Sequence, residues 1–167
     1  CSTFTPTVFP VNVYSLPTPT ITGSTSSCLG ATNKVYSTQP GMTNYQWTVS
    51  AGGIITAGGT TASSSVTVTW TTIGPQTITV NYKNANGCTA SSATVKNITV
   101  NPLPVPTLSG PNLLCAGTTG NIYTTEAGMS SYVWTVSAGG TITSGGTSNS
   151  STATVRWNTD GPQTISV

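Results

Sequence analysis

The sequence predicts an all-β protein built from tandem β-sandwich domains. Apolar side chains alternate with Thr, Ser and Asn in several short runs, and no run has the period of an amphipathic helix. Thr, Ser, Val and Gly are abundant, and β-branched residues suit a pleated, half-buried strand. The whole pattern also occurs twice along the chain. These observations favour short strands joined by tight turns over any helical fold.

The repeat is the strongest pattern in the sequence. One offset of 87 residues aligns Cys1–Val80 with Cys88–Val167 without a gap, and about half of the aligned positions are identical. The run Trp47–Gly53, for example, returns unchanged as Trp134–Gly140. We therefore expect two copies of one structural unit.

Two proline-containing segments mark the repeat boundaries. Leu16-Pro17-Thr18-Pro19 recurs as Leu103-Pro104-Val105-Pro106, and alternate prolines favour an extended, semi-rigid linker. On this register, residues 1–16 are the last strand of a preceding repeat and its linker. Residues 17–104 form one complete repeat, and residues 105–167 form a second repeat without its final strand. We expect the parent protein to be longer, with its repeats arranged as a rod.

Within the complete repeat, alternation and turn signals predict seven strands. We expect them near 18–23, 34–39, 44–51, 53–57, 65–71, 76–83 and 93–100. Turn signals such as Gly58-Gly59, Gly74-Pro75 and Asn86-Gly87 fall between them. The last strand breaks strict alternation, which predicts a bulge near Lys96-Asn97. Seven short strands with this spacing are typical of an immunoglobulin-like sandwich.

The tryptophans are the predicted centres of the cores. Trp47 lies on the third predicted strand, where an inward-facing Trp anchors the space between two sheets. The tryptophans assigned to the two cores are Trp47, Trp70, Trp134 and Trp157.

The charge pattern argues against catalysis, nucleic-acid binding and metal binding. Only 4% of residues are charged, the four cations are scattered, and the chain has no His. A nucleophilic triad needs a base such as His. Glycosidases need two paired carboxylates and calcium sites need several carboxylates, yet Glu126 and Asp160 are the only acidic residues. No segment approaches the roughly 18 apolar residues of a membrane helix. We expect no enzyme activity, cofactor, metal, nucleic-acid partner or membrane span.

The four cysteines predict disulfides formed in an oxidising compartment. Cys28 with Cys88, within one repeat, is the simplest pairing, and Cys1 and Cys115 would then pair outside the fragment. In an ideal seven-strand order, however, the turns that carry Cys28 and Cys88 lie at opposite ends of the sandwich. The alternative is a disulfide between Cys28 and the second cysteine of the following repeat.

Several motifs resemble PKD-like repeats. They include Ser109-Gly110-Pro111 through Cys115-Ala116-Gly117, Tyr123, the Tyr132–Val136 strand with Gly139-Gly140, and the Asn86-Gly87-Cys88 turn. PKD-like repeats are immunoglobulin-fold domains found in tandem in very large surface proteins of Bacteroidota, including adhesins similar to those of gliding motility. The resemblance implies an extracellular or cell-surface location and export by the type 9 secretion system.

Three functions fit these patterns. The first is a structural or adhesive stalk that spaces or presents an adhesive region, with neighbouring repeats as partners. The second is direct binding to surface polysaccharide or to secretion and motility machinery, for which Phe9 and Tyr14 are candidate exposed aromatics. The third is a filament assembled by strand exchange, in which residues 1–13 of one copy complete another copy.

Overall fold

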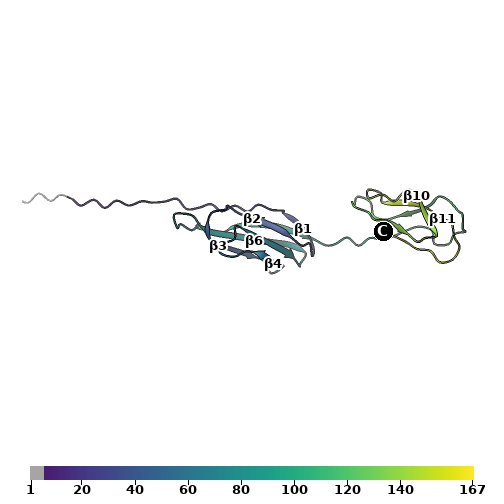
Figure 1. Ribbon diagram of the computed structural model, residues 1–167, viewed down its shortest axis with the longest axis horizontal. Coiled ribbons are helices and arrows are strands. Elements are labelled where there is room, and N and C mark those ends of the chain that lie inside the picture. Colours follow the sequence, from purple (N-terminus) through teal and green to yellow (C-terminus); the bar gives the residue numbers. More distant parts are fainter. Residues whose placement is uncertain (1–5) are drawn as a thin grey trace, which may run out of the picture. The chain divides into compact units, whose positions relative to one another are not determined.

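The computed structural model describes residues 6–167, which form strands and turns (Figure 1). The predicted all-β fold is confirmed. The described chain divides into two compact units between Leu103 and Pro104, which we call unit 1 and unit 2. No helix in this described part is long and apolar enough to cross a membrane.

Unit 1 is a sandwich of two sheets. The first sheet has the strand order β1-β7-β6-β3 and the second has the order β2-β5-β4. The strands of the first sheet are β1 (Ser26–Cys28), β3 (Thr43–Val49), β6 (Gly74–Lys83) and β7 (Thr94–Asn101). Those of the second sheet are β2 (Lys34–Ser37), β4 (Gly53–Gly58) and β5 (Ser65–Trp70).

The core of unit 1 comes from the inward-facing positions of these strands. In β5, Val66, Val68 and Trp70 are buried, and the residues between them are at least partly exposed. In β6, alternate residues from Gln76 to Tyr82 are buried in the same way. The two inner faces meet in one apolar cluster, as expected for sheets that pack face to face.

The first strand differs from its prediction. Only Thr22 of the expected strand at 18–23 pairs, through an antiparallel bridge to Ser37 at the end of β2. The chain then crosses to the other sheet, where β1 runs parallel to β7 with Ser26 opposite Thr99. The sequence did not indicate β1 because Ser26 and Ser27 carry no alternating apolar pattern. Backbone pairing alone defines this strand.

The bulge predicted near Lys96-Asn97 is wrong. The β6–β7 register runs without interruption from Gly74 opposite Val100 to Val80 opposite Thr94. The inward positions of β7 include Lys96, which is half-buried, and Val95 is simply an exposed residue on the outer face. The register shifts of unit 1 lie instead in β3 and β4.

Unit 2 reproduces the second sheet of unit 1 and only part of the first. Its strands are β8 (Asn121–Thr124), β9 (Thr135–Val136), β10 (Gly140–Gly145), β11 (Thr152–Trp157) and β12 (Ile165–Ser166). The order β10-β11-β8 matches β4-β5-β2 at the repeat offset. The other sheet consists of the short pair β12-β9.

Candidate functional site

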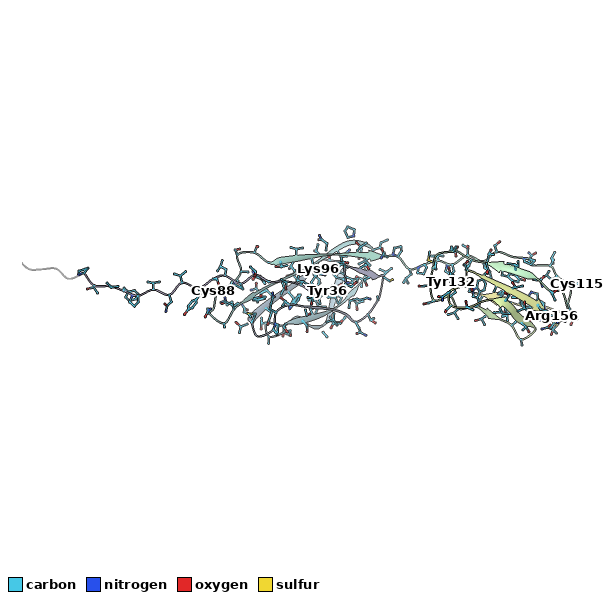
Figure 2. The ribbon with its side chains drawn as sticks, turned by 90° about the horizontal axis from the view of Figure 1, so that it is seen from above. Tyr36, Cys88, Lys96, Cys115, Tyr132 and Arg156 are labelled. Carbon is cyan, nitrogen blue, oxygen red and sulfur yellow. The ribbon has the colours of Figure 1, made fainter. Side chains whose placement is uncertain are left out.

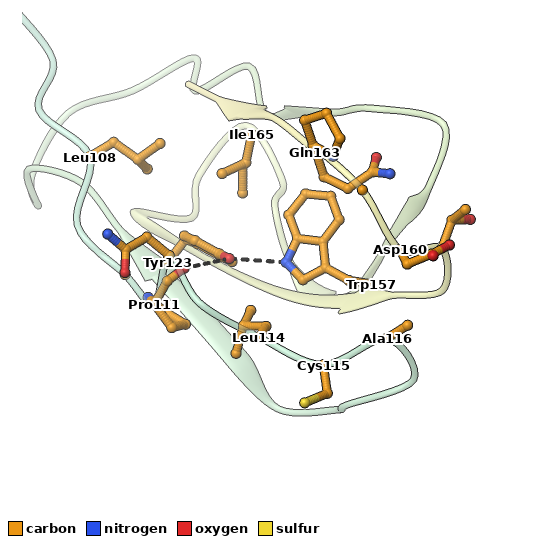
Figure 3. A pocket seen from close by; sticks show the side chains of 15 residues that line it. Leu108, Pro111, Leu114, Cys115, Ala116, Tyr123, Trp157, Asp160, Gln163 and Ile165 are labelled. Carbon is orange, nitrogen blue, oxygen red and sulfur yellow. Dashed lines mark hydrogen bonds between the residues drawn. The ribbon is translucent and has the colours of Figure 1, made fainter.

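Each unit contains a buried tryptophan–tyrosine pair. In unit 1 the Trp70 indole Nε1 donates a hydrogen bond to the Tyr36 hydroxyl at 3.1 Å, and both residues are 0% exposed. In unit 2 Trp157 donates to Tyr123 at 3.0 Å (Figure 3). Burial raises the pKa of Tyr36, although the Trp70 hydrogen bond acts in the opposite direction. A fully buried, un-ionised phenol acts as a structural bridge between β2 and β5.

The remaining two tryptophans are also held by internal hydrogen bonds. Trp47 and Trp134 are each 8% exposed. The Trp47 indole donates to the Ser63 carbonyl and the Trp134 indole donates to the Ser150 carbonyl, both at 2.9 Å. All four indoles are therefore core residues.

Glu126 fixes the segment that leads into unit 2. Its carboxylate accepts hydrogen bonds from the backbone N–H of Thr107 at 3.0 Å and from the hydroxyls of Thr107 and Thr125. Together these hydrogen bonds lower the pKa of Glu126 to about 2, and the bond from the Thr107 hydroxyl has the largest effect. In unit 1 the corresponding Gln39 accepts from the backbone N–H of Thr20 at 3.1 Å. Glu126 is therefore a structural clamp.

The three described cysteines are all free. Cys28 ends β1 and pairs with Asn101 at the end of β7, where the chain leaves unit 1. The Cys88 carbonyl accepts from the N–H of Asn84, just after β6, and the Asn84 side chain donates to the Ser15 carbonyl, where the chain enters unit 1. Figure 2 shows Cys88 at this end of unit 1.

The predicted disulfide between Cys28 and Cys88 is wrong for this fold. Cys28 lies beside the Gly74 end of β6, and Cys88 lies beyond its Lys83 end. A ten-residue strand is about 30 Å long, whereas a disulfide requires Cα atoms within about 7 Å. The partner predicted for Cys115 stays a prediction, and Cys1 lies outside the described residues.

Unit 2 has two open grooves. The larger, about 510 Å³, lies against Trp157 and Tyr123 and is also lined by Leu108, Leu114 and Ile165 (Figure 3). The smaller, about 360 Å³, is lined largely by apolar groups around Tyr132 and the 104–106 segment. The sequence predicted a second repeat without its final strand but not these lining residues, because Tyr123, Trp157 and Ile165 align with Tyr36, Trp70 and Ile78, which are buried in unit 1.

The aligned positions of unit 1 explain why the larger groove is open. Ile78 is 0% exposed in unit 1, whereas the corresponding Ile165 is partly exposed. Ser27 is 4% exposed, whereas the corresponding Leu114 is 41% exposed. In unit 1 both positions lie on strands that pair with β7, Ser27 on β1 and Ile78 on β6. The groove lies at the corresponding place in unit 2.

The ionisable groups of the described residues form no recognisable reactive centre. No three Cys, Asp or Glu residues in this part of the chain lie close enough together to hold a metal ion. The Glu126 carboxylate accepts hydrogen bonds from Thr107 and Thr125. Asp160 lines the larger groove, and Glu126 does not.

Comparison with known proteins gives one family. A family model described as a PKD-like domain matches residues 15–98 and 101–167. No curated protein sequence matches the chain. Among solved structures, the D00-D0 domain of Intimin is similar at 11% sequence identity with a TM-score of 0.41, covering 89% of this chain and 90% of that chain.

Proposed function

The chain belongs to the PKD-like domain family, and we propose that its units are non-catalytic structural modules of a secreted or cell-surface repeat protein. In this role they space or present an adhesive region. The observation that carries the proposal is the parallel pairing of β1 with β7 in a unit whose chain enters at one end and leaves at the other.

This pairing suits a module that bears tension. The chain enters unit 1 near Ser15, beside Asn84, and leaves it after Asn101, at the far end of β6 and β7. A pull on the two ends would therefore load the β1–β7 hydrogen bonds in shear, all together. Two of these bonds, Thr99 N–H to the Thr25 carbonyl and Leu29 N–H to the Asn101 carbonyl, are both 2.8 Å long.

Force spectroscopy on the full chain, held by its two ends, tests this role. The change Ser27→Pro removes a backbone N–H from the middle of β1, so it should lower the force at which unit 1 unfolds. The control Tyr45→Phe removes a hydroxyl that donates to the Gln39 carbonyl at 2.8 Å, away from β1 and β7. It should lower the free energy of unfolding but not the unfolding force. Equal effects of the two changes on the force would contradict the tension-bearing role.

The cysteine positions support a covalent link between successive repeats. Cys28 lies where the chain leaves a unit, and Cys88 lies where it enters one. By the repeat offset, the residue after Asn101 takes the place of Ser15 in the following unit. We propose that Cys28 forms a disulfide with the second cysteine of the following repeat. Peptide mapping of an unreduced, longer array should find this linkage, and a Cys28–Cys88 peptide would contradict it.

The finer cellular role rests on the motif resemblance described above. We propose that the parent protein is a surface adhesin of the Bacteroidota type, exported by the type 9 secretion system. Protease treatment of intact producing cells should then digest these repeats while cytoplasmic proteins survive. Repeats that become accessible only after lysis would contradict the surface location.

A further inference from the structure

The turn that follows β6 contains the one Asn-Gly pair of the sequence, Asn86-Gly87. An antiparallel bridge between Lys83 and Thr89 closes this turn. Within it, the Gly87 N–H donates a hydrogen bond to the Asn84 carbonyl at 2.9 Å, and Gly87 has a φ of 78°, which glycine adopts without strain. This is the pattern of a short hairpin loop that ends in a left-handed glycine.

The two asparagines of the turn differ in how their side chains are held. The Asn84 Oδ1 atom accepts hydrogen bonds from the backbone N–H groups of Asn86 at 3.1 Å and of Cys88 at 3.0 Å. The Asn84 Nδ2 atom donates to the Ser15 carbonyl at 3.2 Å. Asn86 is exposed, and among the hydrogen bonds of the described residues none involves its side chain. The Asn86 carboxamide is therefore free to turn towards the main chain.

The residue after Asn86 leaves the main-chain nitrogen open to this carboxamide. Glycine has no Cβ, and even a Cβ at Gly87 would have no atom within 4 Å. Every other asparagine of the sequence precedes a larger residue. Asn149 is the best comparison, because it is also exposed but precedes Ser150.

We propose that Asn86 is a site of spontaneous deamidation through a succinimide, and that the product opens this turn. The Gly87 N–H first leaves the Asn84 carbonyl, as exposed loops do at low free energy. The Gly87 nitrogen then gives up its proton and bonds to Cγ of Asn86. The Cγ–Nδ2 bond breaks, and Nδ2 takes up a proton and leaves as ammonia.

Water completes the reaction without any oxidant or reductant. It adds to one of the two ring carbonyl carbons, the bond from that carbon to the ring nitrogen breaks, and the nitrogen regains a proton. Attack at Cγ gives aspartate at position 86. Attack at the main-chain carbonyl carbon gives isoaspartate, in which the main chain runs through Cβ and Cγ. This site goes beyond the structural role proposed above and does not depend on it.

The product changes both the charge and the backbone of the turn. Unit 1 contains no Asp or Glu, so a carboxylate at position 86 is its first negative charge, and the formal net charge of the chain falls by one unit from +2. Isoaspartate also adds one carbon to the main chain between Asn84 and Cys88. The Asn84 N–H donates to the Cys88 carbonyl at 2.9 Å, and a longer loop disrupts this closure. The turn then opens at the end of unit 1 where the chain enters (Figure 2).

Isoelectric focusing and peptide mapping of the full chain, after long incubation at neutral pH, test the site. Trypsin cuts after Lys83 and Lys96, so one peptide carries both Asn84 and Asn86. A species with one positive charge fewer should accumulate, and fragmentation of this peptide should place isoaspartate and aspartate at position 86. Asn86→Gln should lose this species, because its longer side chain cannot close the five-membered ring.

Hydrogen exchange on the separated isoaspartyl form tests the opening of the turn. The N–H groups of Asn84 and Cys88 should exchange faster than in the chain before incubation. Asn86→Asp is the matched control, because it carries the negative charge without the additional main-chain carbon. Its two N–H groups should keep their protection.

Three results would overturn the proposal. One is an isoelectric point that stays unchanged through the incubation, and another is a new carboxylate that forms first at Asn149 or at any other asparagine. The third is an isoaspartyl form in which the N–H groups of Asn84 and Cys88 remain fully protected. None of these results bears on the unfolding force of unit 1, so the structural role is tested separately.

Discussion

The Trp70–Tyr36 hydrogen bond permits a quantitative test of the core. In Tyr36→Phe the ring stays and the acceptor is lost, so the Trp70 indole N–H becomes a buried donor without a partner. Such a donor costs about 1–3 kcal/mol. For a domain of about this size, each kcal/mol lowers the melting temperature by about 4–8 °C. A loss of about 2 kcal/mol therefore predicts a decrease of about 8–16 °C for unit 1.

Calorimetry of the full chain measures this shift, and hydrogen exchange identifies which unit gives each transition. Tyr123→Phe in unit 2 is the corresponding variant. Trp157 is 7% exposed and Tyr123 is 6% exposed, so water can reach the orphaned Trp157 donor, but this variant also removes the hydrogen bond from the Tyr123 hydroxyl to the Pro111 carbonyl at 2.9 Å. In a Trp70→Phe background, Tyr36→Phe should cost little more. A loss below about 0.5 kcal/mol for Tyr36→Phe alone would refute the reasoning.

Three further predictions follow from the two units. Because the folded-state pKa of Glu126 lies near 2, below its ordinary value of 4.5, its contribution to unit 2 is complete above pH 4.5 and is lost as the pH falls through 2. Glu126→Gln should remove this dependence in acid titrations followed by fluorescence, and an unchanged titration curve would contradict it. Gly53→Ala should destabilise unit 1 in urea unfolding, because its Cβ would lie 2.6 Å from the Trp70 ring; a neutral effect would mean that the ring can shift. Intact-mass measurement of the monomeric, unreduced chain should show that Cys28 and Cys88 both react with an alkylating agent, and protection of the pair would support the intra-domain disulfide.

Much of unit 1 followed from the sequence because burial leaves a period of two. The predicted strands at 65–71 and 76–83 correspond to β5 and β6, in which every second residue is buried. The same signal misled at β7, where half-buried Lys96 occupies an inward position and Val95 an outward one. A hydrophobic pattern reports the average character of a face, and these two residues do not follow that average.

The candidate site was much less predictable. The clamp around Glu126 depends on Thr107, 19 residues away, and the only sequence sign was that Gln39 occupies the corresponding position. The sequence predicted that residues 105–167 lack a final strand, but it did not indicate which residues line the groove, because Leu114 and Ile165 align with Ser27 and Ile78, which are buried in unit 1. Their exposure depends on which strand covers them, and a pattern within the chain does not contain that information.

The sequence by itself determined the repeat, the all-β class and the residues of the core, because side-chain period and repetition are local properties of the chain. Only the tertiary structure decided the route of the first strand, which leaves β2 at Thr22 and joins β7 at Ser26. That route places Cys28 at the opposite end of unit 1 from Cys88. The pairing of β1 with β7 depends on backbone hydrogen bonds between segments more than 70 residues apart. The side chains of a serine-rich segment such as β1 have no apolar pattern that would predict this pairing.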